Sequence, residues 1–403
     1  MVGMTAGQGR RTALLASYFT FFMPAGVLLS FLSPFLATKG LTVQEIGALV
    51  GLLFAVKLVA SPVIAYASDH LGAHHLTRAV FLVASVGASI GLQLLGGFAA
   101  LAATIMVLSL SRNYFQSVLE ALATEHKTAG TKTNYGAIRL VGSVAVALGV
   151  AGMGAFGTTP ARISRVFTIV LVSSAIGFFV SSVLAHRRDR HVADAASATP
   201  APEPMPMLTR GASPSGPVIA LGGLLLTSAC LIGTHGLLYS VGSLQLAKLG
   251  FERYFATICW IAAFAGEAAG FFLLDRVQRL PLAAFLSLVA FAGVGRWLMF
   301  ANSDSAPVIL MAFALHAVTF AWCHGMLVLQ IRRLFTERFA ATGQAIYLAI
   351  AHGVGISSVA YFGAKLYAAH GRIAFYLPLA LTLVGCGCWA MMAKHFPSTK
   401  ATS

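Results

Sequence analysis

Apolar runs about as long as a bilayer-spanning helix recur along nearly the whole chain. A helix needs roughly 20 consecutive apolar residues to cross the hydrocarbon core of a membrane, and about twelve segments meet that requirement. These segments cover residues 12–37, 43–67, 76–96, 98–123, 134–157, 163–185, 218–247, 253–275, 281–300, 305–334, 339–368 and 372–394. The pattern therefore predicts an all-α membrane protein with twelve transmembrane helices.

One polar stretch interrupts the pattern near the middle of the chain. It begins at "HRRDRH" (residues 186–191) and continues through "ATPAPEPMPM" to Pro217. Proline, alanine and charged residues in this combination are typical of a solvated linker. The linker separates six predicted spans from six. We therefore expect an N-terminal six-helix bundle over residues 1–190, a cytoplasmic linker over 191–216 and a C-terminal six-helix bundle over 217–403.

Composition and charge agree with a membrane location. Of the 403 residues, 58% are hydrophobic and 10% are charged, whereas a soluble domain carries about 25% charged residues. The formal net charge is +15, but basic residues gather in the cytoplasmic loops of membrane proteins whatever their function, so no nucleic-acid partner is expected. With a cytoplasmic N-terminus, Lys and Arg favour the inner side by about two to one. We expect a multi-pass protein of the inner membrane, embedded in the lipid bilayer, with both termini cytoplasmic.

The cysteines give no sign of a redox or metal centre. All of them lie inside apolar runs, which is typical of small packing residues. They are Cys230, Cys259, Cys323, Cys386 and Cys388. We therefore expect neither a cofactor nor a metal site.

Two groups of six spans joined by a long inner loop are the layout of major facilitator superfamily transporters. The loop between spans 2 and 3 contains "SDHLG" (residues 68–72), which resembles the G-x-x-x-D-R-x-G signature of that superfamily. The match is partial, since Ala65 replaces the first glycine and a histidine replaces the arginine. An aspartate beside a basic residue can cap one helix and pair with another. The predicted conformational latch consists of Asp69, Gly72, Asp275 and Arg276.

Ionisable side chains inside the predicted spans are the main functional signal, because such groups are costly in a bilayer and mark pathways or coupling sites. In the first half, Glu120 and Arg139 come from antiparallel neighbours at similar depth, so they can form a structural ion pair or a substrate-binding pair. If Glu267 pairs likewise with Arg296, two cations remain, Lys57 and Arg112. An anionic substrate would compensate them. Lys57 has alternatives, since it could lose its proton or face Asp69 in the neighbouring loop.

In the second half, Glu267, Arg296 and His316 come from three consecutive spans. A carboxylate, a guanidinium and an imidazole together can make a proton site, because ionising one changes what the others prefer. His324 follows His316 by eight residues, about 80° around a helix, so both can face one cavity at different depths. His324 is either a second cavity ligand or a helix-packing group. The predicted proton-coupling residues are Glu267, Arg296, His316 and His324.

The predicted substrate-binding residues extend this set around a central cavity. Tyr114 is included because it follows Arg112 closely and aromatic rings beside charges are candidates for cavity lining. The full set is Lys57, Arg112, Tyr114, Glu120, Arg139, His235 and His352.

Several short motifs resemble the phenylpropionate permease family, a branch of the major facilitator superfamily related to lactose permease-type proton symporters. They are "EALA" (120–123) and "YGAIRLVGS" (135–143) in the first half, and "THGLLY" (234–239), "GRW" (295–297) and the pair Gly266-Glu267 in the second. The resemblance implies substrate binding by Glu120 and Arg139, and proton coupling by Glu267, Arg296 and His316. One departure is that all four tryptophans lie in the second half, so the span-5 tryptophan on which lactose permease stacks its sugar is missing.

These observations predict a monomeric secondary transporter that couples protons to the import of a small organic anion, such as the aromatic carboxylate 3-phenylpropionate. The alternatives within transport are a proton symporter for a neutral nucleoside or sugar, and an efflux antiporter. A non-transporting receptor or scaffold with the same fold is a further alternative. An enzyme is the least supported class, because no nucleophile–base pair or metal set converges.

Overall fold

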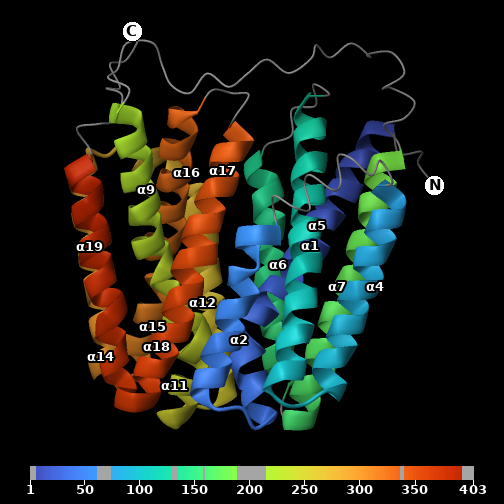
Figure 1. The fold of residues 1–403 in the computed structure, drawn as a ribbon, viewed down its shortest axis with the longest axis horizontal. Coiled ribbons are helices and arrows are strands. Elements are labelled where there is room, and N and C mark those ends of the chain that lie inside the picture. The colour runs from blue at the N-terminus through green and yellow to red at the C-terminus, as the bar shows by residue number, and fades with distance from the viewer. Residues whose placement is uncertain are drawn as a thin grey trace.

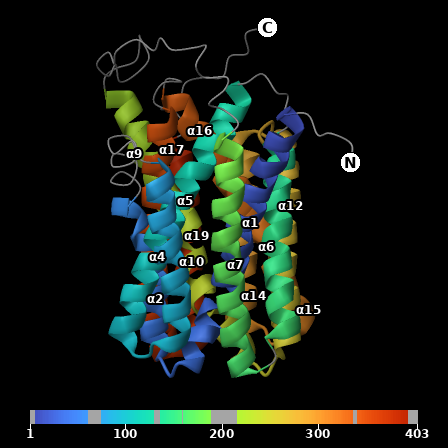
Figure 2. The same cartoon turned by 90° about the vertical axis from the view of Figure 1, so that its right-hand side faces the viewer.

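The computed structural model describes residues 6–60, 74–128, 135–157, 159–187, 215–335 and 340–392. Across these ranges the regular structure is helical and includes no strand. The helices run alongside one another over the height of the molecule (Figures 1 and 2). In the first half they are α1 (Ala6–Thr38), α2 (Val43–Ala55), α4 (His74–Leu94), α5 (Phe98–Thr128), α6 (Tyr135–Phe156) and α7 (Pro160–Arg187). The all-α prediction is confirmed.

The second half has the same character, with more interruptions of its long helices. Its elements are α9 (Ser215–Gly233), α10 (His235–Leu237), η1 (Leu238–Gly242), α11 (Ser243–Lys248), α12 (Arg253–Phe272), α13 (Leu274–Val277), α14 (Leu282–Asn302), α15 (Ala306–Ala314), η2 (Ala317–Trp322), α16 (Cys323–Leu334), α17 (Ala340–Leu348), η4 (Ala349–Ile356), α18 (Ser357–His370), η5 (Gly371–Phe375) and α19 (Tyr376–Met392). Three of these, η1, η2 and η4, are π-helical turns. Such turns occur frequently at functional sites.

The number of membrane crossings agrees with the sequence-based expectation. Ten helices in the described part of the chain are long and apolar enough to cross a membrane, and Val141–Phe156 is a shorter apolar helix. One of the ten, Thr342–Met392, is 51 residues long. It includes η5, where the chain turns back between α18 and α19 (Figure 1). This segment therefore accounts for two of the predicted spans.

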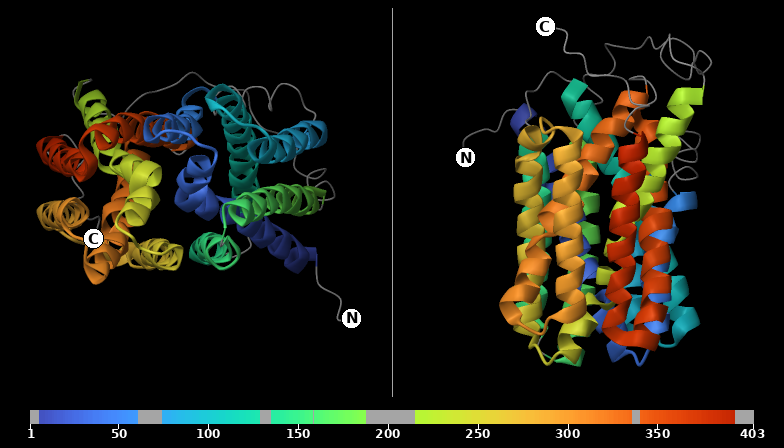
Figure 3. Two further views of the ribbon diagram at one scale, coloured as in Figure 1. Left: turned by 90° about the horizontal axis from the view of Figure 1, so that it is seen from below. Right: turned by 90° about the vertical axis from the view of Figure 1, so that its left-hand side faces the viewer.

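Helices from the two halves of the chain pack closely against each other, α2 against α18 and α6 against α12 (Figure 3). Small residues permit this approach. A Cβ atom at Gly47 of α2 would lie 2.2 Å from Cβ of Ala364, and one at Gly154 of α6 would lie 2.4 Å from the Thr257 side chain. Any larger side chain at these glycines would push the two halves apart.

Hydrogen bonds also join the two halves near the C-terminal end of α1. The Ser33 hydroxyl donates to the Tyr239 carbonyl at 2.8 Å, and the Ser243 hydroxyl donates to the Ser30 carbonyl at 2.7 Å. Trp260 Nε1 donates to Ser243 Oγ at 2.8 Å. These bonds connect α1 to η1 and α11. The two halves are thus joined at the end opposite to the one where α1 begins and α19 finishes, which we call the closed end (Figure 1).

Two of the sequence-based expectations fall on parts of the chain outside this description. Asp69 and Gly72 lie outside the described residues, as does nearly all of the predicted linker. Asp275 and Arg276 lie exposed on α13. There the Asp275 carboxylate accepts a hydrogen bond from Gln278 Nε2 at 3.1 Å, a contact within its own turn. The pairing role of the latch stays a prediction.

Candidate functional site

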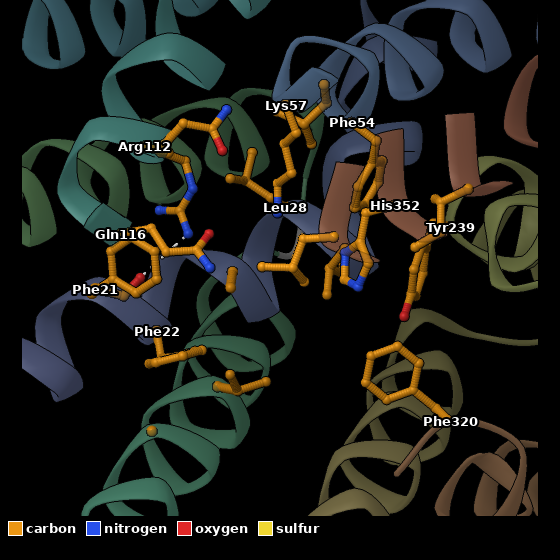
Figure 4. Close-up of a pocket in the computed structure, with 18 of the residues that line it drawn as sticks. Phe21, Phe22, Leu28, Phe54, Lys57, Arg112, Gln116, Tyr239, Phe320 and His352 are labelled. Carbon is orange, nitrogen blue, oxygen red and sulfur yellow. Dashed lines mark hydrogen bonds between the residues drawn. The ribbon is translucent and has the colours of Figure 1, made fainter. Parts of the chain in front are cut away.

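A cavity of about 240 Å³ lies between the two halves of the chain, with side chains from both in its wall. Its polar lining in the first half comes from Lys57, Ser109, Arg112, Asn113, Gln116 and Ser143, and in the second half from Tyr239, Glu267, His324 and His352. Aromatic rings complete it, from Phe21, Phe22, Phe54, Phe264 and Phe320. In the close-up, Arg112 and Gln116 lie on one side and His352 and Tyr239 on the other (Figure 4). The cavity therefore has two chemically different walls.

The cationic wall, defined by Arg112 and Lys57, is built on α5 and on the segment that follows α2. Arg112 Nη2 donates to the Phe21 carbonyl at 3.3 Å, and the guanidinium carbon lies 5.0 Å from the centre of the Phe21 ring (Figure 4). Lys57 Nζ lies 5.9 Å from the centre of the Phe54 ring. Both cations thus sit against aromatic faces, an arrangement that favours a positive charge. Gln116, one helical turn after Arg112, adds an amide to the same wall.

Behind the other wall, Arg296 of α14 is fully buried and holds three polar partners. Nη1 lies 2.5 Å from Thr319 Oγ1 and 3.0 Å from His235 Nε2, while Nη2 lies 3.3 Å from His316 Nδ1. A guanidinium can only donate hydrogen bonds, so each contacted imidazole nitrogen must accept. In the neutral rings the proton is consequently on the opposite nitrogen. His235 Nδ1 lies 3.1 Å from the Ile232 carbonyl, to which it donates.

The same rule puts the ring proton of His316 on the nitrogen that faces Glu267. With Nδ1 accepting from Arg296, the ring proton is on Nε2, which lies 3.4 Å from Oε2 of Glu267. This is an ion-pair distance, but the contact is not a hydrogen bond, and Nε2 has no hydrogen-bond partner among the described residues. The His316 side chain is fully buried, whereas the Glu267 side chain is 20% exposed and lines the cavity. Arg296, His316 and Glu267 thus form a line from the protein interior to the cavity surface.

His316 and His324 belong to a stack of three parallel rings. The His316 and Phe320 ring centres lie 5.0 Å apart with 5° between their planes, and Phe320 and His324 lie 5.6 Å apart with 1°. The expected offset of about 80° assumed a regular α-helix. That assumption was wrong here, because the π-helical turn η2 uses more residues per turn and brings positions i, i+4 and i+8 onto one face. His324 Nδ1 also lies 2.6 Å from the Tyr347 hydroxyl.

Of the remaining predicted substrate-binding residues, some line the cavity and others do not. His352 lines the cavity with Lys57 and Arg112, whereas His235 lies in the Arg296 network behind the wall. Tyr114 is not brought to the described cavity: it is 1% exposed, and its ring stacks on Phe81 at 4.3 Å in the core of the first half.

The predicted pair Glu120 and Arg139 belongs to α5 and α6, but both side chains lie outside what the structure describes. Their pairing and their contact with a substrate remain predictions. Within the described residues, no group of three or more His, Cys, Asp or Glu side chains is placed to hold a metal ion.

Several site residues were not found from the sequence. Thr319, Tyr347 and Gln116 carry no charge at neutral pH, so they do not stand out in the sequence as the charged residues inside the predicted spans do. The spacing of two of the site residues could have indicated them, since Gln116 follows Arg112 by four residues and Tyr239 follows His235 by four. Residues four apart share one face of a helix. Nothing in the sequence marked Tyr347 as the partner of His324.

A bundle of membrane-crossing helices with a polar cavity between its two halves is typical of a secondary transporter. The chain belongs to the MFS_1-like family, whose model matches residues 12–377. It is therefore a multi-pass transporter of the major facilitator superfamily and not an enzyme, which confirms the predicted family, fold class and protein class.

Relatives of known name agree with this assignment. The chain is 26% identical over 399 residues to a probable 3-phenylpropionic acid transporter of Escherichia coli (strain K12), covering 96% of this chain and 98% of the relative. It is 25% identical over 393 residues to a maltose permease of Geobacillus stearothermophilus, covering 96% and 95%. Among solved structures, the nucleoside transporter NupG matches with a TM-score of 0.73 at 12% identity, covering 96% and 99%. A D-xylose–proton symporter matches with a TM-score of 0.69 at 13% identity, covering 97% and 98%.

Proposed function

We propose that this transporter is a proton-coupled symporter that imports a small organic anion, an aromatic carboxylate such as 3-phenylpropionate. The observation that carries the proposal is a cavity lined by Arg112 and Lys57 from the first half of the chain and by Glu267, which lies 3.4 Å from His316, from the second half. It acts as a monomer in the inner membrane, with both termini cytoplasmic.

The cationic wall supports an anionic substrate. A guanidinium and an ammonium group in a cavity shielded from bulk water are strongly stabilised by an incoming carboxylate. The aromatic side chains beside them offer contact surface for a ring. The volume of about 240 Å³ lies below the roughly 300–1,000 Å³ common for sites of drug-sized ligands, which suits a small acid. The likeness to a probable 3-phenylpropionic acid transporter points the same way.

The opposite wall supports proton coupling. Glu267 reaches the cavity, so a proton can arrive there with the substrate. When Glu267 is ionised, the Nε2–H of His316 faces its negative charge. When Glu267 is protonated, that attraction is lost, and the electrostatic interactions among Glu267, His316 and Arg296 change. An anion and a proton together carry no net charge, which lowers the electrostatic cost of moving the loaded carrier. His235 and Thr319 hold Arg296 in place behind this line.

Alternating access follows from the two-part architecture. We propose that bundles over residues 1–190 and 217–403, joined by a linker over 191–216, rock against each other around the cavity. The α2–α18 and α6–α12 contacts would open as the closed end separates, and Asp69, Gly72, Asp275 and Arg276 would latch one conformation. Glu120 and Arg139 complete the substrate site from α5 and α6.

A neutral sugar or nucleoside is the second candidate, supported by the likeness to a maltose permease. Lactose permease stacks its sugar on a tryptophan, whereas no tryptophan lines the described cavity, whose aromatic residues are phenylalanines and Tyr239. Trp260, Trp297 and Trp389 are fully buried elsewhere. A neutral substrate would also bring no counter-charge to Arg112. These observations favour the anion.

Transport in proteoliposomes tests the proposal. Purified protein should accumulate labelled 3-phenylpropionate when the outside is acidified, and a protonophore should abolish accumulation. Excess maltose or nucleoside should not compete. Uptake of a sugar or nucleoside without uptake of any aromatic acid would overturn the substrate claim, and accumulation indifferent to the pH gradient would overturn the coupling claim.

A further inference from the structure

His352 is a cavity residue whose polar atoms have no use in the function proposed so far. It lies on the π-helical turn η4 and lines the cavity. Both of its ring nitrogens are buried, and neither has a hydrogen-bond partner in the described part of the chain. An unsatisfied buried polar group costs free energy, so a residue of this kind within a ligand cavity points to a missing partner.

The backbone around His352 is closely packed. A Cβ atom at Gly353 would lie 2.8 Å from Cγ of Leu58, and one at Gly355 would lie 2.6 Å from the carbonyl oxygen of Ala229. The turn η4 is thus wedged between α9 and the chain that follows α2. In this conformation the close packing keeps the imidazole at the cavity wall, where rotation of the ring can turn a nitrogen toward a ligand.

The position of His352 fixes which end of a substrate it would meet. Arg112 and Gln116 lie on the opposite side of the cavity, and the Tyr239 hydroxyl is directed into the same space as the His352 ring (Figure 4). The Tyr239 ring stacks on Phe54, with centres 5.9 Å apart, and Phe54 also contacts the His352 ring at 6.4 Å. A carboxylate held by Arg112 would therefore direct the far end of the substrate toward an imidazole and a phenol.

We propose that the cavity selects aromatic acids that carry a ring hydroxyl at the end away from the carboxylate, and that His352 recognises this hydroxyl. A phenolic hydroxyl can both donate and accept, so it pairs with either tautomer of the imidazole. An unsubstituted ring would bury the same nitrogens without a partner. A site built to bond a substrate hydroxyl discriminates strongly against the analogue that lacks it. This inference rests on the proposed function, because it takes an aromatic carboxylate as the substrate.

Three acids distinguish a hydrogen bond from a simple fit of size. Proteoliposomes with the full chain are supplied with 3-phenylpropionate, with its 4-hydroxyphenyl derivative, or with its 4-methylphenyl derivative, which resembles the phenol in size but cannot hydrogen-bond. We expect kcat/KM for the hydroxy acid to exceed that for the methyl acid by about tenfold or more, the range set by an unsatisfied buried polar group. Equal values for the hydroxy and methyl acids would overturn the inference.

Variants then assign the preference to His352. In His352→Phe the ratio between hydroxy and methyl acids should fall to about one, whereas His352→Gln, which keeps a donor and an acceptor, should retain part of it. His370→Phe is the matched control, since His370 is exposed at the end of α18. A preference that survives His352→Phe would contradict the assignment. If that variant does not fold, the comparison of the three acids on the unaltered protein still decides whether the hydroxyl is selected. Absence of uptake for all three acids would instead overturn the proposed function, and this inference with it.

Discussion

The Nε2 atom of His316 lies 3.4 Å from a carboxylate oxygen of Glu267, while Nδ1 of the same ring faces Arg296 at 3.3 Å. The imidazole thus stands between a buried cation and a carboxylate at the cavity surface. The charge count from the sequence allowed a direct pair between Glu267 and Arg296 as one possibility. An interposed imidazole lets a change of charge at Glu267 reach Arg296 without contact between the two.

Glu267→Gln should abolish uphill transport while sparing substrate exchange. The amide has a similar shape but takes up no proton, so the pH gradient can no longer drive accumulation. We expect accumulation to fall by about a hundredfold or more, within the range seen when a proton-transfer group is lost, with counterflow retained. Glu252→Gln, at the exposed start of α12, serves as the control. Undiminished accumulation in Glu267→Gln would remove Glu267 from the coupling step.

Arg112→Gln should weaken binding of an aromatic carboxylate. A neutral amide cannot replace the charge opposite the substrate, and loss of a charge-assisted contact costs about 1.5–3 kcal/mol. The KM should rise at least tenfold, with a smaller change in kcat. Arg165→Gln, on the exposed face of α7, tests for a general effect of removing an arginine. An unchanged KM would place the carboxylate elsewhere.

Single replacements of His316 and His324 should separate their roles. His316→Ala should spare substrate binding but abolish gradient-driven accumulation, because it empties the position between Arg296 and Glu267. His324→Ala, and likewise Tyr347→Phe, removes the bond between His324 and Tyr347 and should lower thermal stability in detergent while leaving accumulation in place. If His324→Ala abolished coupling as completely as His316→Ala, His324 would belong to the proton site rather than to helix packing.

Gly47→Ala should impair transport through the interface between the halves. The new methyl group would lie 2.2 Å from Cβ of Ala364, so α2 and α18 must separate at the closed end. We expect uptake to drop severalfold, together with faster labelling of cysteines engineered into that end. Gly87→Ala is the matched control, because a Cβ there meets nothing within 4 Å. Equal behaviour of the two variants would show that close contact at Gly47 is not needed for transport.

The sequence by itself determined that the protein lies in a lipid bilayer, that it is an all-helical membrane protein, and which charged residues make up most of the site. Apolar runs of spanning length are decisive, because a bilayer tolerates only helices whose backbone groups are satisfied internally. The same cost makes each buried charge conspicuous, which is why Arg112, Glu267, Arg296 and His316 could be singled out from a single chain. The short motifs then indicated the family.

Only the tertiary structure decided how these residues are connected. Whether Glu267 meets Arg296 directly or through His316 depends on the relative rotation of three helices, and a π-helical turn shifts that rotation without an evident mark in the sequence. Tyr114 was expected in the cavity but packs on Phe81, because adjacency to Arg112 in sequence places it on another face of α5. That His352 lines the cavity with both ring nitrogens lacking a hydrogen-bond partner among the described residues is visible only in the structure. Contacts between distant helices set these outcomes, and local sequence does not encode them.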